Sequence, residues 1–209
     1  MNQNNMKKLI FLLAGILLQT AFLSAGEPYK AGDVISDISL KNVNGKMVSF
    51  SQFNNAKGFI VVFCCNTCPV VKKYQQRIID LNSQFSDKGY PVIAINSNDK
   101  GVSPGDSYEE MQKYAASKGF KFQYLYDESQ EVAKQWGATN TPHVYVLTKV
   151  GDKLKVAYVG AIDNNADEPD KADKKYVADA VSALLNNEKV PVASTKAIGC
   201  GIKWKKSQV

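Results

Sequence analysis

The sequence is poor in the residues that build disulfide frameworks and metal sites. Among 209 residues it has four cysteines, one histidine and one arginine. A chain of this length can bury a hydrophobic core that is stable without disulfide bonds, so the cysteines do not indicate a disulfide scaffold. With 14 glycines, 7 prolines and 44% hydrophobic residues, the composition excludes collagen and low-complexity disorder. We expect an ordinary globular domain.

Long apolar runs are also missing, which excludes a polytopic membrane protein. The longest, Leu9–Leu18, is shorter than the roughly 20 residues of a transmembrane helix. Lysines precede this run and small residues follow it, as in a secretory signal peptide. We expect a signal peptide at 1–25, cleaved after Ala25 or Gly26, and a periplasmic protein free of the membrane. The alternative is an uncleaved anchor.

The remaining chain, 26–209, alternates strand and helix patterns without a linker or a repeat. The pattern predicts a hairpin at 37–50, strands at 58–63, 91–95, 122–126, 143–147 and 155–159, and helices at 69–85, 107–117, 129–136 and 173–185. The strand at 58–63 is apolar at every position, as in a sheet covered by helices on both faces. We expect one α/β domain with a mixed central sheet and an N-terminal β-hairpin. The tail, 186–209, contains Ile198, Cys200, Ile202 and Trp204, so we expect it to pack on the domain.

Three cysteines lie together where the first buried strand gives way to a helix, in Cys64-Cys65-Asn66-Thr67-Cys68-Pro69. A C-x-x-C in this context is typical of redox proteins, because unpaired N–H groups and the helix dipole stabilise a thiolate. We expect Cys65 to be the exposed nucleophile and Cys68 the more buried resolving thiol. A zinc site or a purely structural disulfide would be the alternatives, but the chain offers few further metal ligands and the loop is very small.

Four segments carry a resemblance to a known family. They are FCCNTCPVVK at 63–72, WGATNTPHVYVL at 136–147, YVGAID at 158–163 and TKAIGCGIKWK at 195–205. Together they resemble thioredoxin-fold redoxins of the alkyl hydroperoxide reductase/thiol-specific antioxidant superfamily, within a peroxiredoxin-like subgroup. The resemblance implies a thioredoxin-like fold, an antioxidant or disulfide-exchange role, and a cis Pro142 whose preceding residue, Thr141, pairs with an extended substrate.

The chain departs from thioredoxin itself at three places. Cys64 replaces the tryptophan before the first cysteine, and Asn66-Thr67 replaces Gly-Pro between the cysteines. Phe59 stands where thioredoxin has a buried acid, so a proton acceptor for Cys68 must come from elsewhere. Asp99, Glu109 or a water are the candidates.

Two other functions fit parts of the pattern. A peroxiredoxin-type peroxidase needs a Thr or Ser three residues before its cysteine and an arginine nearby. The sequence has no Thr or Ser at that position. The one arginine, Arg77, is expected on a solvated helix face and not near the cysteines. A Sco-like copper protein would use Cys64, Cys68 and His143, because two thiolates and an imidazole suit copper. His143, however, directly follows Pro142 and is expected to be a packing residue.

The prediction from sequence is therefore a thiol-disulfide oxidoreductase that uses Cys65 and Cys68. Cys64 and Cys200 are possible additional redox residues; Cys200 could reach back to Cys64 or Cys65, or be a small buried side chain. We expect no cofactor and no metal. The partners would be protein thiols or disulfides and an external reductant, with no nucleic acid, and the protein would be a monomer. Charged side chains exposed to solvent are enough to explain the net charge of +6, which does not indicate a nucleic-acid partner.

Overall fold

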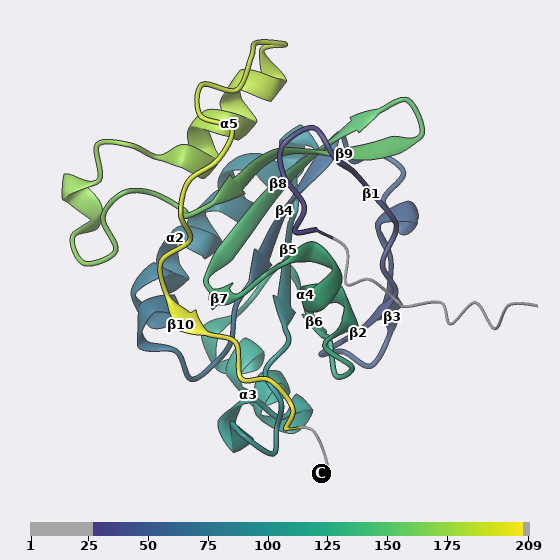
Figure 1. Cartoon of the computed structure of the whole chain (residues 1–209), viewed down its shortest axis with the longest axis vertical. Helices are drawn as coiled ribbons and strands as arrows, with labels where there is room; N and C mark the ends of the chain where they lie inside the picture. Colours follow the sequence, from purple (N-terminus) through teal and green to yellow (C-terminus); the bar gives the residue numbers. More distant parts are fainter. Residues whose placement is uncertain (1–26, 207–209) are drawn as a thin grey trace, which may run out of the picture.

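A mixed eight-stranded sheet forms the centre of the protein (Figure 1). The computed structural model describes residues 27–206, so the predicted signal peptide at 1–25 lies outside it. The strands of this sheet are β1 (Val34–Ile35), β2 (Leu40–Asn42), β3 (Met47–Val48), β4 (Gly58–Phe63), β5 (Val92–Asn96), β6 (Gln123–Tyr126), β8 (His143–Val150) and β9 (Lys153–Gly160). Their order across the sheet is β1-β9-β8-β4-β5-β6-β2-β3.

Helices cover both faces of the sheet. They are α2 (Pro69–Phe85), α3 (Tyr108–Lys118), α4 (Glu131–Trp136) and α5 (Tyr176–Leu185). Alternate β4 residues enter two separate cores: Ile60 and Val62 pack with buried side chains of α2, α3 and α5. Phe59, Val61 and Phe63 pack with α4 and with the N-terminal segments. Every residue of β4 is buried, which explains why its sequence is apolar without alternation.

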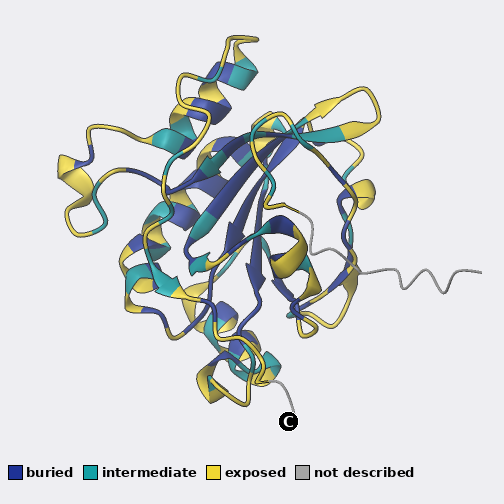
Figure 2. Ribbon diagram, viewed as in Figure 1, coloured by how far each residue is buried: buried dark blue, intermediate teal, exposed yellow. Residues whose placement is uncertain are grey.

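The centre of the sheet is parallel and its flanks are antiparallel. β4 pairs with β5, and β5 with β6, in parallel, whereas β8 runs antiparallel to β4 and then to β9. β2 and β3 form the predicted N-terminal hairpin, with Leu40 opposite Val48, and β2 joins the sheet edge beside β6. This arrangement is the α/β thioredoxin-like fold that the sequence predicts, and Figure 2 shows its buried strands in dark blue between more exposed helices.

Three two-residue strands were not predicted. β1 adds to the sheet beside β9. The other two, β7 (Asn140–Thr141) and β10 (Cys200–Gly201), form a separate antiparallel pair in which Cys200 lies opposite Thr141. This second pair joins the C-terminal tail to the segment directly before Pro142.

The C-terminal tail crosses the domain from α5 to the region near α3, and is drawn in yellow in Figure 1. Ile202 is buried in the core on the α4 side of the sheet. Cys200 is partly buried against the other core, whereas Ile198 is 64% exposed and Trp204 37% exposed. The tail therefore rests on the domain through Cys200 and Ile202, and the other two apolar residues expected to pack there face outward.

Candidate active site

The cysteines occupy the turn between β4 and α2, where the buried strand stops and the helix begins. Cys64 continues the strand, since its N–H donates to the carbonyl of Ile95 on β5 at 2.8 Å. Cys68 is the N-cap of α2, and Pro69 takes the first helical position, where a missing N–H costs nothing. The sequence therefore places Cys68 at the positive end of a 17-residue helix.

Cys65 and Cys68 lie together against Thr141. Cys65 Sγ is 3.5 Å from the Thr141 hydroxyl, and Cys68 Sγ is 3.2 Å from the Thr141 carbonyl oxygen. The sequence predicts an exposed Cys65 and a more buried Cys68. That expectation was wrong: Cys65 is 2% and Cys68 3% exposed. Both thiols are enclosed.

The pKa of Cys68 is lowered. Hydrogen bonding with the Cys65 thiol is the largest cause; burial acts against it, and the Cys200 thiol and the N–H groups of Val71 and Cys200 lower the pKa further. In its protonated form the Cys68 thiol donates to the Thr141 carbonyl. The pKa of Cys65 is raised, first because it donates to Cys68 and second because it is buried.

Cys64 is buried in the core that also contains Cys65 and Cys68. Burial raises the pKa of its thiol to about 12, with a smaller contribution from the charge of Asp106. It lines a cavity of about 10 Å³ together with Cys65 and the rings of Tyr114 and Tyr124. At neutral pH Cys64 is therefore a protonated, enclosed thiol.

A buried carboxylate, Asp106, organises the loop between the two cysteines. It has no exposed surface. Its Oδ1 accepts the backbone N–H groups of Asn66 (2.7 Å) and Thr67 (3.3 Å), and its Oδ2 accepts the Thr67 hydroxyl (2.7 Å). Oδ2 also accepts from Ser103 Oγ (2.7 Å) and Asn98 Nδ2 (2.8 Å). The sequence alone gives no signal for this role of Asp106.

The carboxylates that were expected to serve Cys68 do not contact it. Asp99 accepts the N–H of Val102, and Glu109 is exposed near Ser107. The carboxylate whose charge acts on Cys65 and Cys64 is Asp106, which adds to burial in raising the pKa of both thiols.

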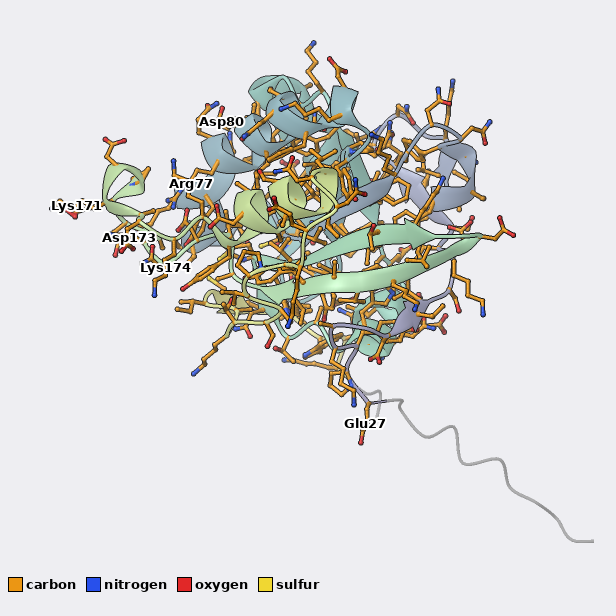
Figure 3. The ribbon with its side chains drawn as sticks, turned by 90° about the horizontal axis from the view of Figure 1, so that it is seen from above. Glu27, Arg77, Asp80, Lys171, Asp173 and Lys174 are labelled. Atoms are coloured by element: carbon orange, nitrogen blue, oxygen red, sulfur yellow. The ribbon has the colours of Figure 1, made fainter. Side chains whose placement is uncertain are left out.

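Arg77 is also placed differently from the expectation. Its side chain is only 15% exposed and forms an ion pair with the buried Asp163 at 2.5 Å. It donates as well to the carbonyls of Asn165 and Ala166, and stacks over Tyr74. Figure 3 shows Arg77 on α2 beside the projecting segment that carries Lys171, Asp173 and Lys174. Arg77 thus ties α2 to that segment and is not the solvated residue predicted.

The Thr141–Pro142 peptide bond is cis. Thr141 belongs to β7, and its partner strand is the chain's own tail: Cys200 is in register with Thr141, and Gly201 with Asn140. The tail also brings the Cys200 thiol and N–H to Cys68. The thiol that Cys200 meets is Cys68, whereas the sequence suggested Cys64 or Cys65.

His143 does not join the cysteines. It follows Pro142 into β8, and its ring packs against Tyr145 with centroids 4.9 Å apart. Burial lowers the pKa of His143 to about 4, so the ring is neutral at pH 7. Between residues 27 and 206, no three His, Cys, Asp or Glu side chains form a group that could hold a metal ion. The combination that a copper site would need is not assembled there.

One hollow on the surface is remote from the thiols. It has a volume of about 750 Å³ and is lined by residues 52–57, 86–89 and 121–123 with their neighbours.

None of the helices in the described part of the chain has the length and hydrophobicity that a membrane crossing requires.

The fold and the thiol pair define a thiol-based redox protein. The profile of the AhpC/TSA family matches residues 31–159, and the chain belongs to that family of thiol oxidoreductases. A curated relative, peroxiredoxin Q of the chloroplast of Sedum lineare, is 24% identical over 168 residues, covering 73% of this chain and 83% of its own.

Two solved structures share most of the chain. An uncharacterized conserved protein from Geobacillus kaustophilus is 35% identical, with a TM-score of 0.78 over 87% of this chain and 96% of its own. A hypothetical protein from Sinorhizobium meliloti is 28% identical, with a TM-score of 0.75 over 84% of this chain and 94% of its own.

Proposed function

We propose that the protein is an extracytoplasmic thiol-disulfide oxidoreductase whose Cys65 and Cys68 cycle between dithiol and disulfide. The observation that supports this is the geometry of the pair. Both sulfurs face Thr141, and Cys68 sits at the start of α2 with a lowered pKa. A thiolate beside a second thiol can form a mixed disulfide with a substrate and then have it resolved by its neighbour.

Cys68 makes the first attack in this proposal. Its thiolate attacks one sulfur of a protein disulfide, the substrate S–S bond breaks, and a mixed disulfide forms while the other substrate sulfur leaves as a thiolate. The two cysteines thereby exchange the roles that the sequence predicts for them. The place of Cys68 at the N-terminus of α2 and its lowered pKa support this order.

Cys65 then resolves the mixed disulfide. Its pKa is raised mainly by donating to Cys68, and this cause disappears once the Cys68 charge has been lost to the new S–S bond. Cys65 gives its proton to the leaving substrate thiolate and attacks Cys68 Sγ. The products are a reduced substrate and a Cys65–Cys68 disulfide, which an external dithiol reduces again.

The experiment is a glutathione redox titration of the purified protein, with free thiols alkylated at each point and all four cysteines mapped by mass spectrometry. We expect one reversible Cys65–Cys68 disulfide. In a background that lacks the Cys200 thiol, Cys65→Ser should accumulate a mixed disulfide on Cys68 with a model protein disulfide, and Cys68→Ser should not accumulate one on Cys65. A pair that stays reduced throughout the titration would remove this function.

A peroxidase is the second candidate, because the curated relative is a peroxiredoxin and Cys68 is the thiolate. The Cys68 sulfur would attack a peroxide oxygen, the O–O bond would break, and a sulfenic acid and water or an alcohol would form. Cys65 would then condense with the sulfenic acid and release water. Arg77 is bound to Asp163 and does not support this reaction. Stopped-flow oxidation by hydrogen peroxide separates the two functions, since only a peroxidase would outpace a free cysteine.

A further inference from the structure

The tail that carries Cys200 is fixed on both sides of this residue. On its upstream side, Thr195 Oγ1 lies 2.6 Å from the hydroxyl of Tyr158 and accepts the N–H of Ala161 at 2.9 Å. The N–H of Thr195 donates to the carbonyl of Val159 on β9 at 2.9 Å. The segment that leads to Cys200 therefore starts from a fixed point beside the central sheet.

On the downstream side, the tail is held by a buried side chain and by backbone bonds. Ile202 is 6% exposed, and its N–H donates to the carbonyl of Thr139 at 2.9 Å. The N–H of Lys203 donates to Asn98 Oδ1 at 2.8 Å, and that asparagine also donates to Asp106. The same network that shapes the loop between the cysteines thus also holds the tail.

Between these anchors, Cys200 and Gly201 add to β7 as an antiparallel strand. Asn140 Nδ2 donates to the carbonyl of Gly199 at 3.1 Å. Strand addition to a free edge is a common way to bind an extended peptide, with side chains facing alternate pockets. The tail therefore lies where an extended partner chain would have to pair, and it presents a thiol to Cys68 as a substrate cysteine would.

We propose that Cys200 is a third exchanging thiol, which accepts the disulfide from the Cys65–Cys68 pair through the docked tail. In this step the Cys200 sulfur attacks Cys68 Sγ, the Cys65–Cys68 bond breaks, and a Cys68–Cys200 bond forms. The proton of Cys200 passes to the Cys65 thiolate. No electrons are gained or lost, and the proposal rests on the proposed function of the pair.

The position of Cys200 gives this step a direction. Cys65 and Cys68 are enclosed, whereas Cys200 is only partly buried and follows the exposed stretch around Ile198. Burial and the neighbouring Cys68 raise the pKa of Cys200, and the second cause disappears when Cys68 is oxidised. A bulky external dithiol reaches a sulfur on the tail more readily than a sulfur of the enclosed pair. The exchange thus moves the disulfide toward the surface, where it is reduced.

The first test uses Cys65→Ser and glutathione disulfide under native conditions. Oxidation of Cys68 by glutathione should be followed by attack of Cys200, so peptide mapping should find a Cys68–Cys200 disulfide within one chain. Accumulation of Cys68 as its glutathione adduct, with Cys200 still open to alkylation, would overturn the inference. A disulfide between Cys200 residues of two chains would overturn it as well.

The second test moves the tail without touching a cysteine. A Cβ on Gly199 would lie 2.0 Å from the Thr141 carbonyl oxygen, so Gly199→Ala must push the strand from β7. A Cβ on Gly201 would meet only the Thr139 oxygen at 4.0 Å, so Gly201→Ala is the matched control. In the Cys65→Ser background we expect about tenfold slower formation of the Cys68–Cys200 bond with Gly199→Ala. Equal rates in the two variants would count against docking as the cause.

A third variant separates this inference from the function on which it rests. In Cys200→Ser, the Cys65–Cys68 disulfide should still form in the glutathione titration, but its reduction by a bulky external dithiol should slow. If the pair cycles and is reduced at the unchanged rate, Cys200 has no part in exchange and only the inference fails. If the pair does not cycle in the unmodified protein, the proposed function fails first.

Discussion

Asp106→Asn is the substitution that most directly probes how the site is built. The variant keeps the shape of the side chain but removes its charge and turns one acceptor oxygen into an N–H₂ donor. Oδ1 faces two backbone N–H groups, from Asn66 and Thr67, and Oδ2 faces two hydroxyls and the Asn98 amide. The hydroxyls can turn and accept, but the N–H groups cannot. Whichever way the new amide points, at least one buried N–H loses its acceptor.

The expected cost follows from these contacts. A buried donor left without an acceptor costs about 1 to 3 kcal/mol, and a hydrogen bond to a charged group is worth roughly 1 kcal/mol more than a neutral one. Because such terms do not add fully, we expect a loss of about 2 to 4 kcal/mol in the free energy of unfolding. With a urea slope of about 2 kcal/mol per molar, the midpoint should fall by about 1 to 2 M.

Urea unfolding of the reduced protein, followed by the fluorescence of the buried Trp136, measures this loss. The control is Asp99→Asn, the same exchange on the same loop, where the carboxylate accepts only the N–H of Val102 and the asparagine oxygen can replace it. Equal midpoints for the two variants would refute the role assigned to Asp106. The charge has a second readout: because Asp106 raises the pKa of Cys65 and Cys64, Asp106→Asn should lower both.

Four further predictions concern the thiols and the tail. Because the pKa of Cys68 is lowered, one thiolate should persist at pH values below the usual cysteine pKa of about 8.5 and be lost only in acid. Ultraviolet absorbance of the thiolate should show this signal in the unmodified protein but not in Cys68→Ser. Cys64→Ala should leave the glutathione midpoint unchanged, because that thiol is protonated and faces the core. Asp163→Asn breaks the enclosed ion pair of α2 and should cost about 3 kcal/mol in urea without moving the thiolate titration. Ile202→Ala removes the buried side chain that anchors the tail, at a cost of about 2 kcal/mol. Alkylation of the enclosed thiol pair should therefore become more than about tenfold faster. An unchanged rate would mean that the tail does not limit access to the pair.

The elements that follow a strong periodic pattern could be predicted from sequence. β4 and α2 have the predicted bounds, because a continuous apolar run and a proline at the first helical position are local signals. The predicted hairpin and the α/β fold class were confirmed for the same reason. Cys65 and Cys68 could be selected because their spacing and position between strand and helix are visible in the chain.

The parts that were missed depend on contacts between distant segments. β7 and β10 are two residues long and exist only because the tail returns to Thr141. Asp106 looks like any loop aspartate until the loop folds against Asn66 and Thr67. The burial of Cys65 likewise could not be read from its neighbours in the sequence. Such features need the assembled fold, since no local propensity encodes them.

The return of the tail also orders the events of synthesis. Ribosomes synthesise the chain from its amino end, so the strands and helices around the thiols are made before the tail. Cys200 can be held opposite Thr141 only after Ile202 and Lys203 have reached their places against Thr139 and Asn98. A chain stopped shortly before Cys200 would carry the complete thiol pair without the strand that pairs with β7. Synthesis of residues 199–203 is therefore the step that adds the third thiol to the site.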